Sequence, residues 1–225
     1  MKQIPILFST EMVQAILAGR KTQTRRVIKN QPELDTEKYG AATTKDGTQE
    51  WIIGNPESTT VDVIKCPYGQ VGDLLWVRES CLWVSLDHAP DLLEGNRDGS
   101  QWVYKASVHE DFIKYAKEQY GYKWRPSIHM PKYAARIWLK IKAIRIERLQ
   151  DISEDAAIEE GIEEIHPAPF VIRYKNYLDT KNQAILKDPK LSFRTLWESI
   201  NGVDAWHANP WVWVIEFERI EKPNI

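Results

Sequence analysis

Gly19-Arg20-Lys21-Thr22-Gln23-Thr24-Arg25-Arg26 is the stretch around which this 225-residue chain is arranged. Four of the seven residues from Arg20 to Arg26 are cations, two are threonines, and none is acidic. Like charges this close together repel one another unless a polar or anionic group lies opposite them. One interpretation is a solvated edge strand, in which Lys and Arg side chains prevent aggregation. The other is a site in which Lys21 and Thr24 face one cavity, while the arginines hold a phosphate or a polar base.

Before this stretch, the sequence predicts a short strand followed by a helix. Residues 4–8 are mostly apolar. Ser9 or Thr10 can cap the helix, and the apolar residues from 12 to 17 follow helical spacing. Gly19 suits the position just after the helix end, and the cations that follow it complement the helix dipole.

The other regular elements are short, and three long polar segments separate them. Apolar patterns predict strands over 61–65, 74–79, 101–106, 136–147 and 211–219, and helices over 109–120, 154–160 and 192–200. The separating segments are expected to be insertions at about 30–60, 85–125 and 166–190, the first with a small hairpin around 51–53. The long strand changes its apolar phase near Ala143-Ile144, which predicts a β-bulge or a sharp bend. We therefore expect a single α+β domain over residues 1–225, built around a small, curled sheet.

Composition limits the possible functions. With 43% hydrophobic residues, 28% charged residues and a net charge of −2, the chain has an ordinary globular composition and is not a polycation. No apolar run reaches the length of a membrane span, and no signal peptide is recognised, so we expect a cytoplasmic protein without membrane contact. Five scattered histidines and two cysteines offer neither metal-ligand spacing nor a disulfide framework. We expect no metal and no cofactor.

Charge is distributed unevenly in the second half of the chain. Residues 121–148 contain eight Lys or Arg and a single acid, whereas residues 149–165 contain seven acids and no Lys or Arg. Such blocks are typical of the solvated faces of a strand and a helix. Glu159 and Glu160, however, fall in the last turn of the predicted helix, where the macrodipole disfavours an anion by about 0.3–1 kcal/mol. If Glu160 turns back towards Lys21, this anion is compensated and the pair lines a pocket.

Four segments, in order, resemble the motifs of ASCH domains, which belong to the PUA-like superfamily. They are Ile16-Leu17-Ala18-Gly19-Arg20-Lys21-Thr22-Gln23-Thr24-Arg25, Gly72-Asp73-Leu74-Leu75-Trp76-Val77, Leu149-Gln150-Asp151-Ile152-Ser153 through Glu160, and Val214-Ile215-Glu216-Phe217. The first is the most specific of the four. Two further segments resemble those of long ASCH proteins from bacteriophages and prophages: Arg125-Pro126-Ser127-Ile128-His129-Met130-Pro131 and Asn209-Pro210-Trp211.

The resemblance implies both a fold and an activity. The implied fold is a PUA-like small β-barrel, closed or curled, with flanking helices and a cleft suited to a nucleoside or single-stranded RNA. The best-understood enzymes of this kind, the N4-acetylcytidine amidohydrolases, use a Lys, a Thr and a Glu. These correspond here to Lys21, Thr24 and Glu160, with Glu159 as the alternative acid. Further ligand contacts are expected from Arg20, Thr22, Arg25, Arg26, Trp76, Arg78 and Glu79.

Three functions remain open at this point. The first is hydrolysis of an acylated nucleoside by a Thr24 nucleophile and a Lys21 base, which requires burial and the neighbouring arginines to lower the pKa of Lys21. Glu160 would then protonate the leaving amine or orient the other groups. The second is a non-catalytic RNA- or nucleotide-binding module. The third is an accessory protein of phage origin whose insertions bind a phage or host protein.

The spacing of the motif also predicts its geometry. Lys21 and Thr24 are three residues apart, so in an ideal strand they point to opposite faces. We therefore expect an irregular backbone from Lys21 to Thr24, which would bring both side chains and Glu160 into one cleft. We also expect Arg25 and Arg26 to separate, one towards the cleft and the other towards solvent.

Overall fold

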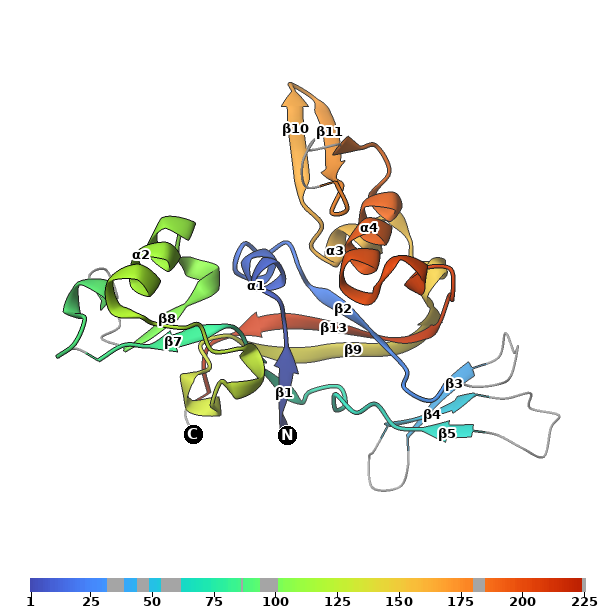
Figure 1. Cartoon of the computed structure of the whole chain (residues 1–225). Coiled ribbons are helices and arrows are strands. Elements are labelled where there is room, and N and C mark those ends of the chain that lie inside the picture. The colour runs from blue at the N-terminus through green and yellow to red at the C-terminus, as the bar shows by residue number, and fades with distance from the viewer. Residues whose placement is uncertain are drawn as a thin grey trace.

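The computed structural model describes residues 1–31, 39–43, 49–53, 62–85, 87–93, 101–179 and 185–223. Within these residues the chain has a mixed α/β fold with several sheets and four α-helices (Figure 1). The largest sheet has five strands, in the order β1 (Gln3–Leu7), β6 (Leu74–Arg78), β9 (Trp138–Arg148), β13 (Trp211–Ile220) and β2 (Gln23–Val27). Strands β1 and β6 are parallel, and the other neighbouring pairs in this sheet are antiparallel.

The helices begin at side chains that accept a backbone N–H, as the capping rule predicts. They are α1 (Thr10–Leu17), α2 (Glu110–Tyr120), α3 (Glu154–Glu159) and α4 (Pro189–Asn201), capped by Ser9, His109, Ser153 and Asp188. Gly19, with a φ of 74°, follows the end of α1. The predicted strand and helix before the basic stretch are therefore confirmed. None of the described helices has the length and hydropathy needed to cross a membrane.

Two cores lie on opposite faces of β13. Trp213 and Ile215 pack with the apolar side of α1, whereas Val212 and Val214 pack with α3 and α4. Because side chains alternate along a strand, β13 separates the two cores and is buried on both faces from residue 211 to residue 215. Strand β2 pairs with β13 and forms the edge of the sheet. Its side chains therefore also point alternately to the α1 side and to the side of α3 and α4.

The predicted bulge in the long strand β9 is confirmed. Ala143 pairs with Glu216 and Ile141 pairs with Phe217, so Lys142 has no opposite residue on β13. One additional residue shifts the alternation of the strand, which is why buried isoleucines occur on both sides of the change in phase. The bulge also bends the strand, as the curvature of β9 and β13 in Figure 1 shows.

The five-stranded sheet is not a closed barrel. Strands β1 and β2 lie at its two ends, and no strand pairing joins them within the described residues. Of the two expected forms, the closed one is therefore not found. The two edges are nevertheless close together, because Arg26 Nη2 donates a hydrogen bond to the carbonyl oxygen of Leu7 at 2.7 Å. The structure agrees with the expected small α+β fold around a curled, open sheet.

Three smaller sheets lie within and next to the expected insertions. They are β3 (Tyr39–Thr43), β4 (Gln49–Ile53) and β5 (Asp62–Ile64); β7 (Cys81–Trp83) and β8 (Trp102–Tyr104); and β10 (Glu164–Ala168), β11 (Val171–Lys175) and β12 (Ile185–Leu186). The hairpin expected around residues 51–53 is confirmed by the pairing of β3 with β4. The hairpin β10–β11 projects from the main sheet beyond α3 and α4 (Figure 1). Residues 32–38, 44–48, 54–61, 86, 94–100 and 180–184 of these segments lie outside the described residues.

Candidate active site

The candidate site forms where the segment after α1, the start of β2 and the end of α3 meet. The N–H of Thr22 donates to the carbonyl oxygen of Glu159 at 2.9 Å, and Lys21 forms an isolated antiparallel bridge with Glu160. Gly161 follows with a φ of 86°, and a Cβ added there would lie 2.7 Å from the Cβ of Lys21. Glycine at this position therefore allows the two segments to approach closely.

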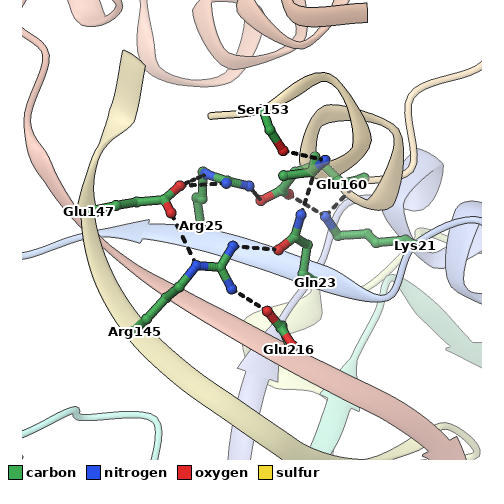
Figure 2. Close-up of polar contacts among 9 residues, drawn as sticks. Lys21, Gln23, Arg25, Arg145, Glu147, Ser153, Glu160 and Glu216 are labelled. Carbon is green, nitrogen blue, oxygen red and sulfur yellow. Dashed lines mark hydrogen bonds and ion pairs between the residues drawn. The ribbon is translucent and has the colours of Figure 1, made fainter. Parts of the chain in front are cut away.

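Lys21 and Glu160 form a buried ion pair in this site (Figure 2). Lys21 Nζ lies 2.7 Å from Glu160 Oε2 and donates a second hydrogen bond to the carbonyl oxygen of Glu160 at 2.8 Å. Lys21 is 2% exposed and Glu160 is 4% exposed. The side chain of Glu159 is exposed. Of the two candidate acids, Glu160 is therefore the one beside Lys21.

Arg25 continues the network of charges on the other side of Glu160. Its Nη1 donates to Glu160 Oε1 at 3.0 Å, and its Nε donates to Glu147 Oε1 at 2.9 Å. Arg145 in turn contacts Glu147 and Glu216 (Figure 2). Cations and acids alternate along this network, so each buried charge has an opposite charge beside it. Strand β2 lies at the edge of its sheet, but the interpretation of a solvated basic edge is wrong for the cations of this network.

Burial has the largest effect on the ammonium group of Lys21. Desolvation lowers the pKa of Lys21, and the positive charges of Arg26 and Arg25 lower it further, while the charge and the hydrogen bond of Glu160 raise it. The net result is a lowered pKa. A larger fraction of Lys21 is therefore neutral than in water, and the neutral amine is the form that can accept a proton.

Thr24 lies in the regular part of β2, directly opposite Ile215 of β13. Opposite residues of antiparallel strands share a face, so Thr24 lies on the α1 side of the sheet, as Ile215 does. Lys21 precedes the strand, and its Nζ lies 5.8 Å from the centre of the Phe8 ring, which belongs to the same core. The irregular backbone that we expected ends before β2 begins, so the expectation is wrong for Thr24 itself. Because Lys21 precedes the regular strand, its side chain can still reach the side of the sheet on which Thr24 lies.

Thr24 and Glu160 both line a cavity of about 70 Å³. The other residues of its wall are Met12, Arg25, Arg26, Val27, Phe193, Leu196, Trp197, Ile200 and Asn201. The indole Nε1 of Trp197 is buried and has no hydrogen-bond partner within the described structure. A buried donor without a partner costs about 1–3 kcal/mol. An oxygen atom of a ligand in this cavity could accept this hydrogen bond.

Three of the expected ligand contacts lie close to the site, and Arg26 lines its cavity. Arg20 is exposed, and its Nη1 donates to the carbonyl oxygens of Gly161 at 2.9 Å and Ile162 at 3.3 Å. Thr22 is also exposed and contributes its backbone to the site. Arg26 does separate from its neighbour, but it lies half-buried, 5.2 Å from the centre of the Phe8 ring. Arg25 is buried as well, so the expectation that one of the two arginines would point to solvent is wrong. The curled sheet brings β1 against Arg26.

The other three expected ligand contacts are not brought to the site. Glu79 is 1% exposed, and Arg136 donates to both of its oxygens at 2.9 Å. The guanidinium of Arg78 lies 5.5 Å from the centre of the Trp76 ring and donates to the carbonyl oxygen of Ile128. None of these three side chains lines the cavity beside Glu160. The ion pair with Arg136 holds Glu79, and stacking holds Arg78 against Trp76, at the end of β6.

Several residues of the site were not predicted from the sequence. Glu147 is the single acid in the basic segment 121–148, and this isolation was a usable signal. Gln23 donates from Nε2 to the carbonyl oxygen of Ala156 at 2.6 Å, which fastens β2 to α3. A polar residue such as Gln23 in a buried strand was a weaker signal. No sequence pattern marked Trp197 as a residue of the site. In the part of the chain that the structure describes, no group of three His, Cys, Asp or Glu side chains could hold a metal ion.

Comparisons with known proteins do not assign this site. No protein-family model matches the chain. No curated protein and no solved structure matches it either. The function must therefore be argued from the geometry of the site and from its chemistry.

Proposed function

We propose that this chain is an amidohydrolase that acts on an acylated nucleoside of the N4-acetylcytidine type, carried by a PUA-like ASCH domain. The observation that carries the proposal is the buried Lys21–Glu160 ion pair beside a cavity that Thr24 lines. Active sites are where burial and close charges are combined to shift the pKa of a reacting group. A purely structural strand edge has no need of a buried lysine whose pKa is lowered.

The residues have distinct roles in the proposed reaction. The Oγ1 of Thr24 attacks the amide carbonyl carbon, and neutral Lys21 accepts the hydroxyl proton. The C–N bond then breaks, the leaving amine takes a proton from Lys21, and the acyl group remains as an ester on Thr24. Water hydrolyses this ester and restores the threonine. Glu160 orients Lys21 through the 2.7 Å hydrogen bond and balances its charge when it is protonated.

The carbonyl oxygen gains negative charge during the attack and needs a donor. Trp197 lines the same cavity, and its buried Nε1–H has no hydrogen-bond partner among the described residues. A buried donor that is held in place before the reaction is an effective way to stabilise such an oxyanion. Trp197 is therefore our candidate for the group that binds this oxygen.

A non-catalytic RNA-binding module is the second candidate function. A module that binds phosphates needs accessible cations. Lys21 and Arg25 are instead buried and paired with acids. This pairing favours the hydrolase over a groove in which the basic stretch follows an RNA backbone.

The test compares two neighbouring threonines. Purified protein is incubated with N4-acetylcytidine, and cytidine release is followed by chromatography. Thr24→Ala should lower kcat/KM by at least about 100-fold, because it removes the nucleophile. Thr22→Ala is the matched control and should keep nearly full activity, because its side chain is exposed and does not line the cavity. If the wild-type protein releases no cytidine, or if the two variants behave alike, the proposal is wrong.

A further inference from the structure

A larger cavity lies between α1, α4 and the hairpin β10–β11, with a volume of about 650 Å³. Ligand sites for small molecules usually measure about 300–1,000 Å³. The hairpin contributes Ile165 and Lys175, Glu163 precedes it, and the chain after it contributes Asn176, Tyr177 and Asp179. Four of these six residues, from Lys175 to Asp179, belong to the segment that the sequence marked as the third insertion.

This cavity adjoins the candidate active site. A smaller cavity of about 70 Å³ lies between them, lined by Glu160 and Gly161 on one side and by Glu163 and Tyr177 on the other. Leu196 of α4 lines all three cavities. A ligand with its reacting group beside Thr24 could therefore extend its remaining part towards the hairpin.

The walls of the larger cavity carry more acids than cations. Among the described residues that line it, Glu11, Glu163 and Asp179 are acids and Lys175 is the one cation. The Nζ of Lys175 lies 2.8 Å from Glu163 Oε2, so its charge is already compensated. Arg20 lines the smaller cavity, where carbonyl oxygens of the backbone hold its guanidinium. A phosphate group placed here would meet a net negative surface, and like charges brought together strongly disfavour binding.

The polar groups of this cavity suit hydroxyl groups. Carboxylates accept hydrogen bonds from hydroxyl donors. Tyr177 adds an aromatic ring, and burial together with the charges of Glu163 and Glu11 raises the pKa of its phenol to about 12, so it stays neutral. Leu196 and Ile200 supply an apolar surface. The lining thus combines acceptors for hydroxyls with apolar contact area, as sites for sugars require.

We infer that this cavity binds the uncharged, hydroxyl-bearing part of the ligand and excludes phosphorylated forms. The inference rests on the proposed function for the identity of the reacting group. It adds that this cavity selects free nucleosides over nucleotides and over nucleosides within RNA. The residues that carry this selectivity are Glu11 and Glu163.

Binding and hydrolysis separate this inference from the proposed function. Calorimetry with cytidine and with cytidine 5′-monophosphate needs no reaction, and the nucleoside should bind at least about tenfold more tightly. Hydrolysis of N4-acetylcytidine should likewise exceed that of its 5′-monophosphate, mainly through KM. Equal binding of the two forms would overturn the inference, whether or not hydrolysis occurs. Binding of cytidine without any hydrolysis would overturn the proposed function alone, and absence of cytidine binding would overturn both.

A pair of variants tests the named residues. Glu11→Gln combined with Glu163→Gln removes two negative charges and leaves Lys175 without its ion pair, so binding of the monophosphate should improve about tenfold relative to that of cytidine. Glu164→Gln is the matched control, because Glu164 belongs to the same hairpin but does not line the cavity. The Glu164→Gln variant should prefer cytidine over its 5′-monophosphate to the same extent as the wild-type protein. An unchanged preference in the double variant would contradict the assignment.

Discussion

At the scale of single residues, Glu160 shows how an unfavourable local position is stabilised by tertiary contacts. It caps the C-terminal end of α3, where the dipole disfavours an anion by about 0.3–1 kcal/mol. Lys21 and Arg25 each bind one of its oxygens. Two cations beside the buried side chain offset this cost. The same three charges hold the end of α3 against the start of β2.

A double-mutant cycle on Lys21 and Glu160 tests this coupling. Lys21→Met should destabilise the protein by about 3–5 kcal/mol, because breaking a buried pair leaves Glu160 without one of its partners. Glu160→Gln should also destabilise, since Lys21 and Arg25 then lose their common anion. The double variant should cost clearly less than the sum of the two, and urea unfolding measures all three. Additive effects would show that the two residues do not stabilise each other.

The sequence predicted these residues better than it predicted their partners. Lys21, Thr24 and Glu160 could be named because a motif and a misplaced acid marked them. Arg25 was expected to hold a ligand, but it is held by Glu160 and Glu147. The partner of a charge depends on which distant segments meet, and no pattern within one segment contains that information.

At the scale of elements, Gly161 sets how closely α3 and β2 approach. Its φ of 86° favours glycine, and an added Cβ would lie 2.7 Å from Lys21 and 2.9 Å from Ala15. The turn after α3 therefore combines a backbone requirement with a steric one. Gly121 follows α2 in a similar conformation, with a φ of 70°, but nothing lies within 4 Å of an added Cβ there.

This pair of glycines gives a matched test. Gly121→Ala should cost about 1–2 kcal/mol, the usual strain of a left-handed conformation for a residue with a Cβ. Gly161→Ala should cost about 1–3 kcal/mol more, because the Cβ also clashes with packed neighbours. It should lower the activity proposed above as well, since Lys21 must move. Thermal unfolding gives the difference, and equal losses for the two variants would argue against the close contact.

The elements themselves were largely predictable, for reasons that the bulge in β9 illustrates. Alternation and its single change of phase are local properties, so the strand and its irregularity at Lys142 could be inferred from the sequence. The order of the strands could not be inferred, because β1 joins β6 and β2 joins β13 through contacts distant in sequence. The expectation of an irregular backbone at Thr24 failed for the same reason. Spacing alone did not reveal that Lys21 lies outside the strand, where its bridge to Glu160 sets the direction of its side chain.

At the scale of the whole molecule, charge and shape together limit what can bind. The net charge is −2, and two cations of the basic stretch, Lys21 and Arg25, are buried in ion pairs. The cavity of about 650 Å³ beside the hairpin β10–β11 has more acids than cations among its described residues. Under the function proposed above, this charge distribution favours a small neutral ligand, whose binding releases few counterions, over a polyanion.

This charge distribution predicts how binding responds to salt. The dissociation constant of cytidine should change less than about twofold between 50 and 200 mM salt, because no phosphate is neutralised. A single-stranded RNA of about ten nucleotides should bind weakly or not at all at the higher concentration. Isothermal calorimetry measures the first and fluorescence anisotropy the second. If the RNA binds tightly and its affinity falls steeply with salt, then accessible cations elsewhere on the chain contact its backbone. The RNA-binding module would then be the better account of this protein, and the buried network around Lys21 would be a structural support.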